Sequence, residues 1–260
     1  MRKISILNFV IISFILQISS IVYAKAANNI VGVDVDYWMS KLNADVRSTD
    51  LGLLGTKIDA INDLDVSNSE NIISASINLN ILRSHRFVVS YFALDVKGQK
   101  ILSEDIAYKG VTYSAATDVS SGLKATLFEG YYEVMLLKQS FGEVGILLGA
   151  KYAQIEASLS NAVNGEQSES IDGGVPIIGV QAEVKLPAKF VLSSIAKGFN
   201  LSTGNIDFTV FDMQAALNYN FNRFSRACLG YRYFLIDGED SNSLAKVVLN
   251  GPYAGVTFSF

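Results

Sequence analysis

Apolar and polar residues alternate with a period of two along most of this chain. Across residues 178–186 every second residue is apolar, and the residues between them are glycine, polar or charged. Successive side chains of a β-strand point to opposite faces, so this pattern predicts strands with one apolar face. The stretches that carry it are 30–38, 73–82, 87–94, 123–137, 144–152, 178–186, a strand from 190, 211–221, 229–235 and a last strand ending at 260. We therefore predict an all-β domain of about ten strands, with eight or twelve as alternatives.

Short and long connections alternate between these strands. The short turns are 83–86, 138–143, 187–189 and 222–225, and the long loops are 45–70, 97–121, 157–174, 199–206 and 237–246. A transmembrane antiparallel up-and-down β-barrel has short periplasmic turns and long extracellular loops, and the connections of this chain follow that pattern. Within the second long loop we expect a hairpin, near 106–113, that stands above the membrane.

Aromatic residues also lie beside the short turns, where an interfacial girdle is expected. They are Phe87, Phe141, Phe190, Phe221, Phe224 and Phe260. A soluble β-sandwich accounts for the alternation but does not require this placement of aromatic residues. The two observations together favour the transmembrane barrel, with the sandwich as the alternative.

The N-terminal segment has a different composition from the rest of the chain. Arg2 and Lys3 precede a long apolar run over residues 4–22, and Ala24 and Ala26 each end a small-x-small pattern. We predict a signal peptide over 1–24, cleaved after Ala24 or Ala26, and a barrel over 27–260. A retained membrane anchor is the alternative. The net charge is −4 without a basic cluster, which argues against a nucleic-acid partner.

The last ten residues are Gly251-Pro-Tyr-Ala-Gly-Val-Thr-Phe-Ser-Phe260. This strand is apolar on one face, small or polar on the other, and ends in an aromatic residue. It resembles the closing strand of small outer-membrane β-barrel proteins of Gram-negative bacteria, in particular a group that ends in Gly-Pro-Tyr-x-Gly-x-x-Phe-x-Phe. Segments 35–38 (Val-Asp-Tyr-Trp) and 230–233 (Gly-Tyr-Arg-Tyr) fit the same group.

The resemblance implies a location in the outer membrane, with membrane lipid and the barrel-assembly machinery as partners. It also implies that Phe258 and Phe260 belong to the assembly signal. It supplies no catalytic residue, cofactor or metal ligand, and we predict none.

The predicted register points a set of charged side chains into the lumen. They are Asp34, Asp36, Glu129, Glu133, Lys151, Glu183, Lys185 and Arg232. We expect Lys151 to lie diagonal to Glu129, and Arg232 to reach Asp34 or Asp36 across the last strand. The alternative is that each charge is hydrated separately in a wet lumen.

Three further positions carry reactive or ligating groups. His85, the single histidine, falls in a predicted periplasmic turn, whereas the barrel enzymes of similar size (omptin proteases, lipid A deacylases and palmitoyltransferases) use a histidine near the outer rim. We expect Cys228 to face the lumen beside Arg232. A nearby guanidinium would make such a thiol reactive, and the alternative is that Cys228 is a small, inert space-filling side chain. Residues 237–243 contain oxygen ligands suited to calcium, but not at the spacing of an EF-hand. A solvated acidic loop is the favoured interpretation.

These features predict an outer-membrane barrel with a structural role or a narrow pathway for small solutes, and with long acidic extracellular loops. A surface-binding or adhesion protein that acts through those loops is the alternative. An outer-membrane enzyme that works without histidine is the least favoured reading, so we predict that the protein is not an enzyme.

Overall fold

The computed structural model describes residues 30–48, 55–82, 84–203, 206–239 and 243–260. The predicted signal peptide lies outside the described residues. In the described part, no helix is long and apolar enough to cross a membrane.

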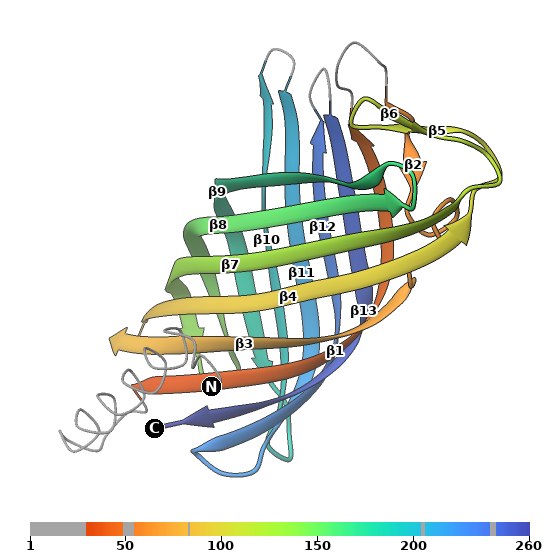
Figure 1. The fold of residues 1–260 in the computed structure, drawn as a ribbon. Helices are drawn as coiled ribbons and strands as arrows, with labels where there is room; N and C mark the ends of the chain where they lie inside the picture. The colour runs from red at the N-terminus through yellow and green to blue at the C-terminus, as the bar shows by residue number, and fades with distance from the viewer. Residues whose placement is uncertain (1–29, 49–54, 83, 204–205, 240–242) are drawn as a thin grey trace, which may run out of the picture.

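Ten long strands form one closed antiparallel barrel in which each strand pairs with its neighbours along the chain (Figure 1). The strands are β1 (Val31–Ser48), β3 (Ser69–Leu82), β4 (His85–Ile101), β7 (Asp118–Gln139), β8 (Gly142–Asn161), β9 (Gly165–Lys185), β10 (Phe190–Thr203), β11 (Ile206–Asn220), β12 (Ser225–Glu239) and β13 (Ser243–Ser259). Three short strands accompany them: β2 (Ile58–Asp59), β5 (Ile106–Tyr108) and β6 (Val111–Tyr113). The predicted fold and strand number are confirmed.

The first and last long strands close the barrel. Asp36 of β1 lies opposite Gly255 of β13, and Val35 lies opposite Val256. The backbone N–H of Ile30 donates to the carbonyl of Phe260 at 2.7 Å, so pairing extends to the last residue. Both ends of the described chain therefore lie at the end of the barrel that carries the short turns (Figure 1).

The outside of the barrel is apolar next to the short turns. Leu148 keeps 64% of its surface exposed and Ile178 also keeps 64%, although both are large aliphatic residues. Such a belt is stable only against lipid. Phe141, Phe221 and Phe260 are exposed at its lower edge, and Tyr91, Phe128 and Tyr152 are exposed at its upper edge. These two sets form the aromatic girdles of a membrane-spanning barrel.

Above the upper girdle the two faces of the wall exchange character. On β4, the outward residues Val89 and Tyr91 are followed by Asp95 and Lys97, which point the same way. The inward residues Phe92, Leu94 and Val96 are each buried to at least 95%. The same exchange occurs on β7 and β8, where Lys124 and Glu156 lie outward and Leu123 and Ile155 are buried inside.

This upper part of the barrel is called the extension. It comprises residues 40–48, 55–68, 92–127 and 153–175, together with the upper ends 199–203, 206–210, 234–239 and 243–249. Apolar inside and polar outside is the pattern of a protein domain in water, so we place the extension above the membrane.

The extension corrects part of the prediction of long loops. Long strands occupy most of 157–174, 199–206 and 237–246, which were expected to be loops, whereas most of 45–70 and 97–121 lies between long strands, as expected. The expected hairpin exists as β5–β6, but it packs against the inner wall instead of standing free. Tyr113 is completely buried, and its hydroxyl donates to the carbonyl of Leu159 at 3.0 Å. Leu64 and Val66, from the segment before β3, join the same apolar core.

Candidate functional site

The lumen has three levels, and each is built from a different kind of side chain. Polar residues line a cavity at the periplasmic end, a cluster of buried charges fills the middle, and the apolar core of the extension fills the top. Inward residues of the long strands contribute to all three levels, because side chains alternate across the wall, and the β5–β6 hairpin and the segment before β3 add to the top level.

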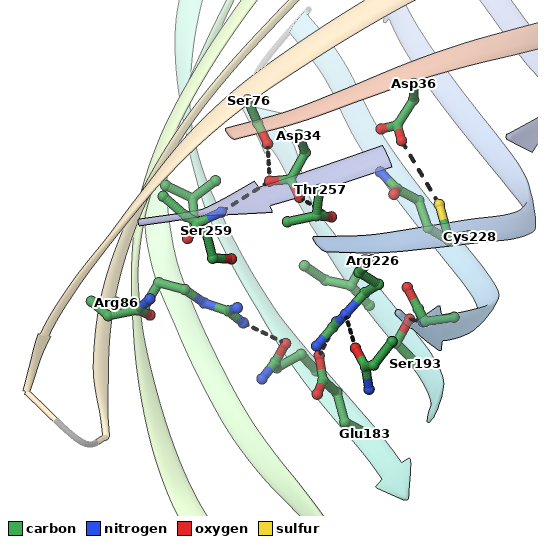
Figure 2. Close-up of a pocket in the computed structure, with 18 of the residues that line it drawn as sticks. Asp34, Asp36, Ser76, Arg86, Glu183, Ser193, Arg226, Cys228, Thr257 and Ser259 are labelled. Atoms are coloured by element: carbon green, nitrogen blue, oxygen red, sulfur yellow. Dashed lines mark hydrogen bonds and ion pairs between the residues drawn. The ribbon is translucent and has the colours of Figure 1, made fainter. Parts of the chain in front are cut away.

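The periplasmic cavity has a volume of about 390 Å³. It reaches from the turn at Asn222 and Arg223 upward to Tyr131 and Tyr253. Figure 2 shows Asp34, Arg86, Glu183 and Arg226 projecting into it from different strands. Both signs of charge are therefore present in one water-accessible space.

Neutral partners, and not cations, satisfy Asp34. The carboxylate accepts hydrogen bonds from Ser76 Oγ at 2.8 Å, Asn78 Nδ2 at 3.0 Å and Thr257 Oγ1 at 2.6 Å (Figure 2). Asp36 lies one layer higher and accepts a long contact from Cys228 Sγ at 3.9 Å. The two aspartates thus tie β1 to β3, β12 and β13 at the closure of the barrel.

Two arginines bridge the cavity wall. Arg86 Nη2 lies 2.8 Å from Glu133 Oε2 and donates to Gln181 Oε1 at 3.0 Å. Arg226 lies 3.7 Å from Glu183 and donates through Nε to Asn220 at 3.0 Å. These contacts span from β4 to β9 and from β12 to β9, so they cross the lumen.

The middle level is called the lumen cluster, and it contains Glu129, Lys151, Lys197, Asp212 and Arg232. Lys151 Nζ lies 2.9 Å from Glu129 Oε2 and 3.0 Å from Asp212 Oδ2. Lys197 pairs with the other oxygen of Glu129. Arg232 binds Asp212 at two points, through Nε at 3.1 Å and Nη2 at 2.8 Å. The cluster joins five strands from β7 to β12 across the barrel.

Aromatic rings enclose the cations of the lumen cluster. The guanidinium of Arg232 lies 4.8 Å from the ring centre of Trp38 and 4.9 Å from that of Phe92. Lys151 Nζ lies 4.7 Å from the ring centre of Phe234. Cation–π contacts of this kind are stronger where water is excluded. They also join the cluster to the apolar core above it.

Several sequence predictions about the lumen need correction. Arg232 pairs with Asp212, and not with Asp34 or Asp36, because Asp212 is a diagonal neighbour on the adjacent strand whereas the aspartates of β1 lie beyond β13. Lys151 lies directly opposite Glu129, and not diagonal to it. Lys185 lies at an inward-facing position of the alternation, but its side chain is exposed at the periplasmic rim.

Sequence reasoning missed Asp212 and Lys197 as members of the cluster, and Arg86 and Arg226 as lumen cations. The sequence pattern could have identified Asp212, since it lies on the inner face of a clearly alternating strand. Lys197 was not, because the strand from 190 has small residues on both faces and gives no clear register.

The remaining candidates lie away from this cluster. His85 stacks on Tyr132 at the periplasmic end, with ring centres 5.7 Å apart. Asp237 pairs with Lys246 at 3.0 Å on the outer face of the extension, and the next part of the acidic run, 240–242, lies outside the described residues. In the part of the chain that the structure describes, no group of three or more His, Cys, Asp or Glu side chains is arranged to hold a metal ion.

No family model matches this chain, and no curated protein sequence matches it. Among solved structures, it is similar to the outer membrane protease OmpT from Escherichia coli, with a TM-score of 0.56 and 12% identity over 90% of this chain and 98% of that one. Weaker similarities include the translocator domain of the autotransporter NalP from Neisseria meningitidis (TM-score 0.49, 12% identity, 96% of this chain and 95% of that one).

The protein is an outer-membrane β-barrel. At 12% identity the similarity to OmpT concerns the fold alone. Together with the lipid-facing belt and the two aromatic girdles, this fold places the chain in the Gram-negative outer membrane.

Proposed function

We propose that this protein is a closed outer-membrane barrel that does not conduct solutes and that binds a partner at the cell surface through its extension. This proposal keeps the structural role expected from the sequence and adopts surface binding in place of narrow transport.

The observation that carries the proposal is the burial of lumen-facing side chains in the middle of the barrel. Asp212 has no exposed surface, Lys151 has 2% and Glu129 has 5%. Trp38 and Phe234, which cover the lumen cluster, are each 1% exposed. Side chains that lined a water-filled channel at this level would be wet. Their burial supports a filled lumen.

The design of the extension supports a role in binding. Its core includes Tyr108, Tyr113 and Leu159, all at least 98% buried, so it is a packed structure rather than a set of loops. Rigid surfaces lose less conformational entropy on binding than loops do. The proposal assigns no catalytic step, since the single histidine lies at the opposite end of the barrel.

Conductance in planar lipid bilayers tests the sealed lumen. We expect no discrete conductance steps from the wild-type protein. The double variant Glu129→Ala with Lys151→Ala removes one carboxylate and one ammonium from the lumen cluster, and we expect it to show a small leak. Asp237→Asn, in an exposed pair, is the control and is expected to stay silent. Regular conductance steps from the wild-type protein, growing with salt concentration, would overturn the proposal.

A further inference from the structure

The barrel wall is incomplete at one seam. Pairing between β9 and β10 begins at Lys185 and Val191 and ends at Ile178 and Gly198. Beyond that point β9 pairs only with β8, down to Gly165, and β10 pairs only with β11, up to Thr203, among the described residues. Figure 1 shows the upper part of β9 turning away from the upright β10. Residues 165–176 and 199–203 are called the seam.

The local sequence explains why pairing ends there. Pro176 is the second residue beyond the last pair, and proline has no backbone N–H to offer a neighbouring strand. Gly173 and Gly174 follow, and glycine in a strand weakens it. The departure of β9 is therefore encoded in the chain.

The seam lies above the membrane. Gly174 is opposite Tyr152, the upper girdle residue of β8, and the free edge of β9 continues upward from there. Among the described residues, no strand pairs with the seam-facing edge of β9 over 165–176 or of β10 over 199–203. Free strand edges of this kind accept an added strand from another chain.

The side chains at the seam indicate what kind of strand fits. On the inner side, Ile171 and Leu201 keep 44% and 43% of their surface exposed, although both have inward parity. Alternate apolar side chains of an inserted strand would cover them. On the outer side, Glu166 and Asp172 are exposed, and the seam contains no lysine or arginine. Glu169 is already paired with Lys109 of the β5–β6 turn, and Asp172 Oδ2 accepts a hydrogen bond from the hydroxyl of Tyr152 at 2.8 Å, which leaves its other oxygen for a cation.

We propose that the seam binds an extended basic peptide segment of a partner protein by β-strand addition. The backbone of the peptide hydrogen-bonds to the free edges of β9 and β10, its apolar side chains cover Ile171 and Leu201, and its cationic side chains face Glu166 and Asp172. A second copy of this chain is a poor occupant, because two acidic β9 edges repel each other. The inference rests on the proposed function, since it names the ligand class of the extension.

The test uses the full mature protein in phosphatidylcholine nanodiscs and a fluorescent ten-residue probe of alternating lysine and valine. We expect saturable binding in fluorescence anisotropy. A probe of equal charge with proline at alternate positions cannot form the sheet hydrogen bonds and is expected to bind at least tenfold more weakly. A glutamate–valine probe is expected not to bind. Equal binding of the lysine–valine and proline probes would reduce the interaction to surface charge and overturn the proposal.

Chain variants locate the binding site. Glu166→Lys combined with Asp172→Lys is expected to weaken binding of the lysine–valine probe at least tenfold. Glu156→Lys, on the outer face of the fully paired β8, is the matched control and is expected to bind as the wild type does. Both variants are first checked for heat-modifiable migration, which reports a folded barrel. Unchanged binding by a folded double variant would also overturn the proposal.

Oligomeric state and conductance separate the remaining outcomes. A dimer that the probe dissociates would identify a second copy as the occupant and contradict this inference. Failure of the probe to bind a non-conducting barrel would refute the strand-addition site alone. Channel activity of the wild-type protein would refute the sealed lumen, whatever the probe does.

Discussion

The guanidinium of Arg232 forms a two-point ion pair with the carboxylate of Asp212 on the adjacent strand, at 3.1 and 2.8 Å. Lys151 approaches the same carboxylate at 3.0 Å. Asp212 therefore serves two cations at once in the middle of the lumen, and it is fully buried. Together with Glu129, this carboxylate offsets two of the three positive charges in the lumen cluster.

Asp212→Asn is expected to destabilise the barrel by about 3–5 kcal/mol, because three buried cations would then share one carboxylate. The measurement is the urea midpoint of unfolding in lipid vesicles. Asp237→Asn is the control. Asp237 pairs with Lys246 at the surface, where side-chain exposures of 33% and 43% limit the contribution to about 1 kcal/mol or less. Similar losses for the two variants would show that the lumen cluster is hydrated rather than buried.

Leu148→Arg is expected to cost about 2–4 kcal/mol, since the residue faces lipid near the middle of the belt. Gln154 lies on the same face of β8 but above Tyr152, so Gln154→Arg is expected to cost less than about 1 kcal/mol. Refolding into vesicles at a series of urea concentrations measures both. Equal costs at the two positions would place the upper limit of the membrane above Tyr152.

Deletion of Phe260 is expected to reduce insertion into the outer membrane. The backbone N–H and C=O of this residue bond to Val31 and Ile30 at 2.7 Å each, so the deletion shortens the closing pair of strands. The missing ring also leaves a gap in the lower girdle. Heat-modifiable protein in the membrane fraction is the readout, with Phe260→Trp as the control that retains an aromatic end. Normal assembly of the truncated chain would exclude Phe260 from the assembly signal.

Asp59 gives the extension a local dependence on pH. Burial raises the pKa of its carboxyl, but hydrogen bonds from Asn62 and Ile61 outweigh this and hold the pKa below its usual value. Because the pKa of Asp59 is lower in the folded state than in the unfolded state, its ionised carboxylate stabilises the folded turn at pH values above the unfolded pKa of about 4. This contribution is lost as the pH falls through the folded pKa.

Hydrogen exchange of segment 58–63 in wild type and Asp59→Asn, compared at each pH, measures this contribution. We expect slower exchange in the wild type at pH 6, with the difference vanishing on acidification. A difference that stayed constant down to pH 2 would contradict the assignment.

Sequence patterns predicted the strands within the membrane because one rule applies to all of them there. Val180 and Leu148 lie outward on paired strands, and Gln181 lies inward, as the alternation requires. The same rule failed above Tyr91. There the apolar residues shift to Phe92, Leu94 and Val96, so a continuing strand looked like the end of one. Segment 165–174 was missed for a different reason, because it pairs on one edge only and has few apolar residues to reveal it.

This exchange of faces leads to an expectation opposite to that for the belt. Val96 points inward in the extension and is 2% exposed, whereas its neighbour Lys97 points outward and is exposed. Val96→Asp buries a charge without a partner and is expected to destabilise the extension by about 3 kcal/mol or more. Lys97→Asp changes a solvated position and is expected to stay within about 0.5 kcal/mol of the wild type.

Limited proteolysis of the folded protein in vesicles distinguishes the extension from the belt. Val96→Asp is expected to expose cleavage sites in 97–121 while the membrane-embedded part resists digestion. Lys97→Asp is expected to resist digestion as the wild type does. The inward position is therefore the sensitive one above Tyr91, whereas the outward position, as in Leu148→Arg, is the sensitive one below it. Equal protease resistance of Val96→Asp and Lys97→Asp would mean that the top of the barrel is open to water, and the account of a packed extension would fail.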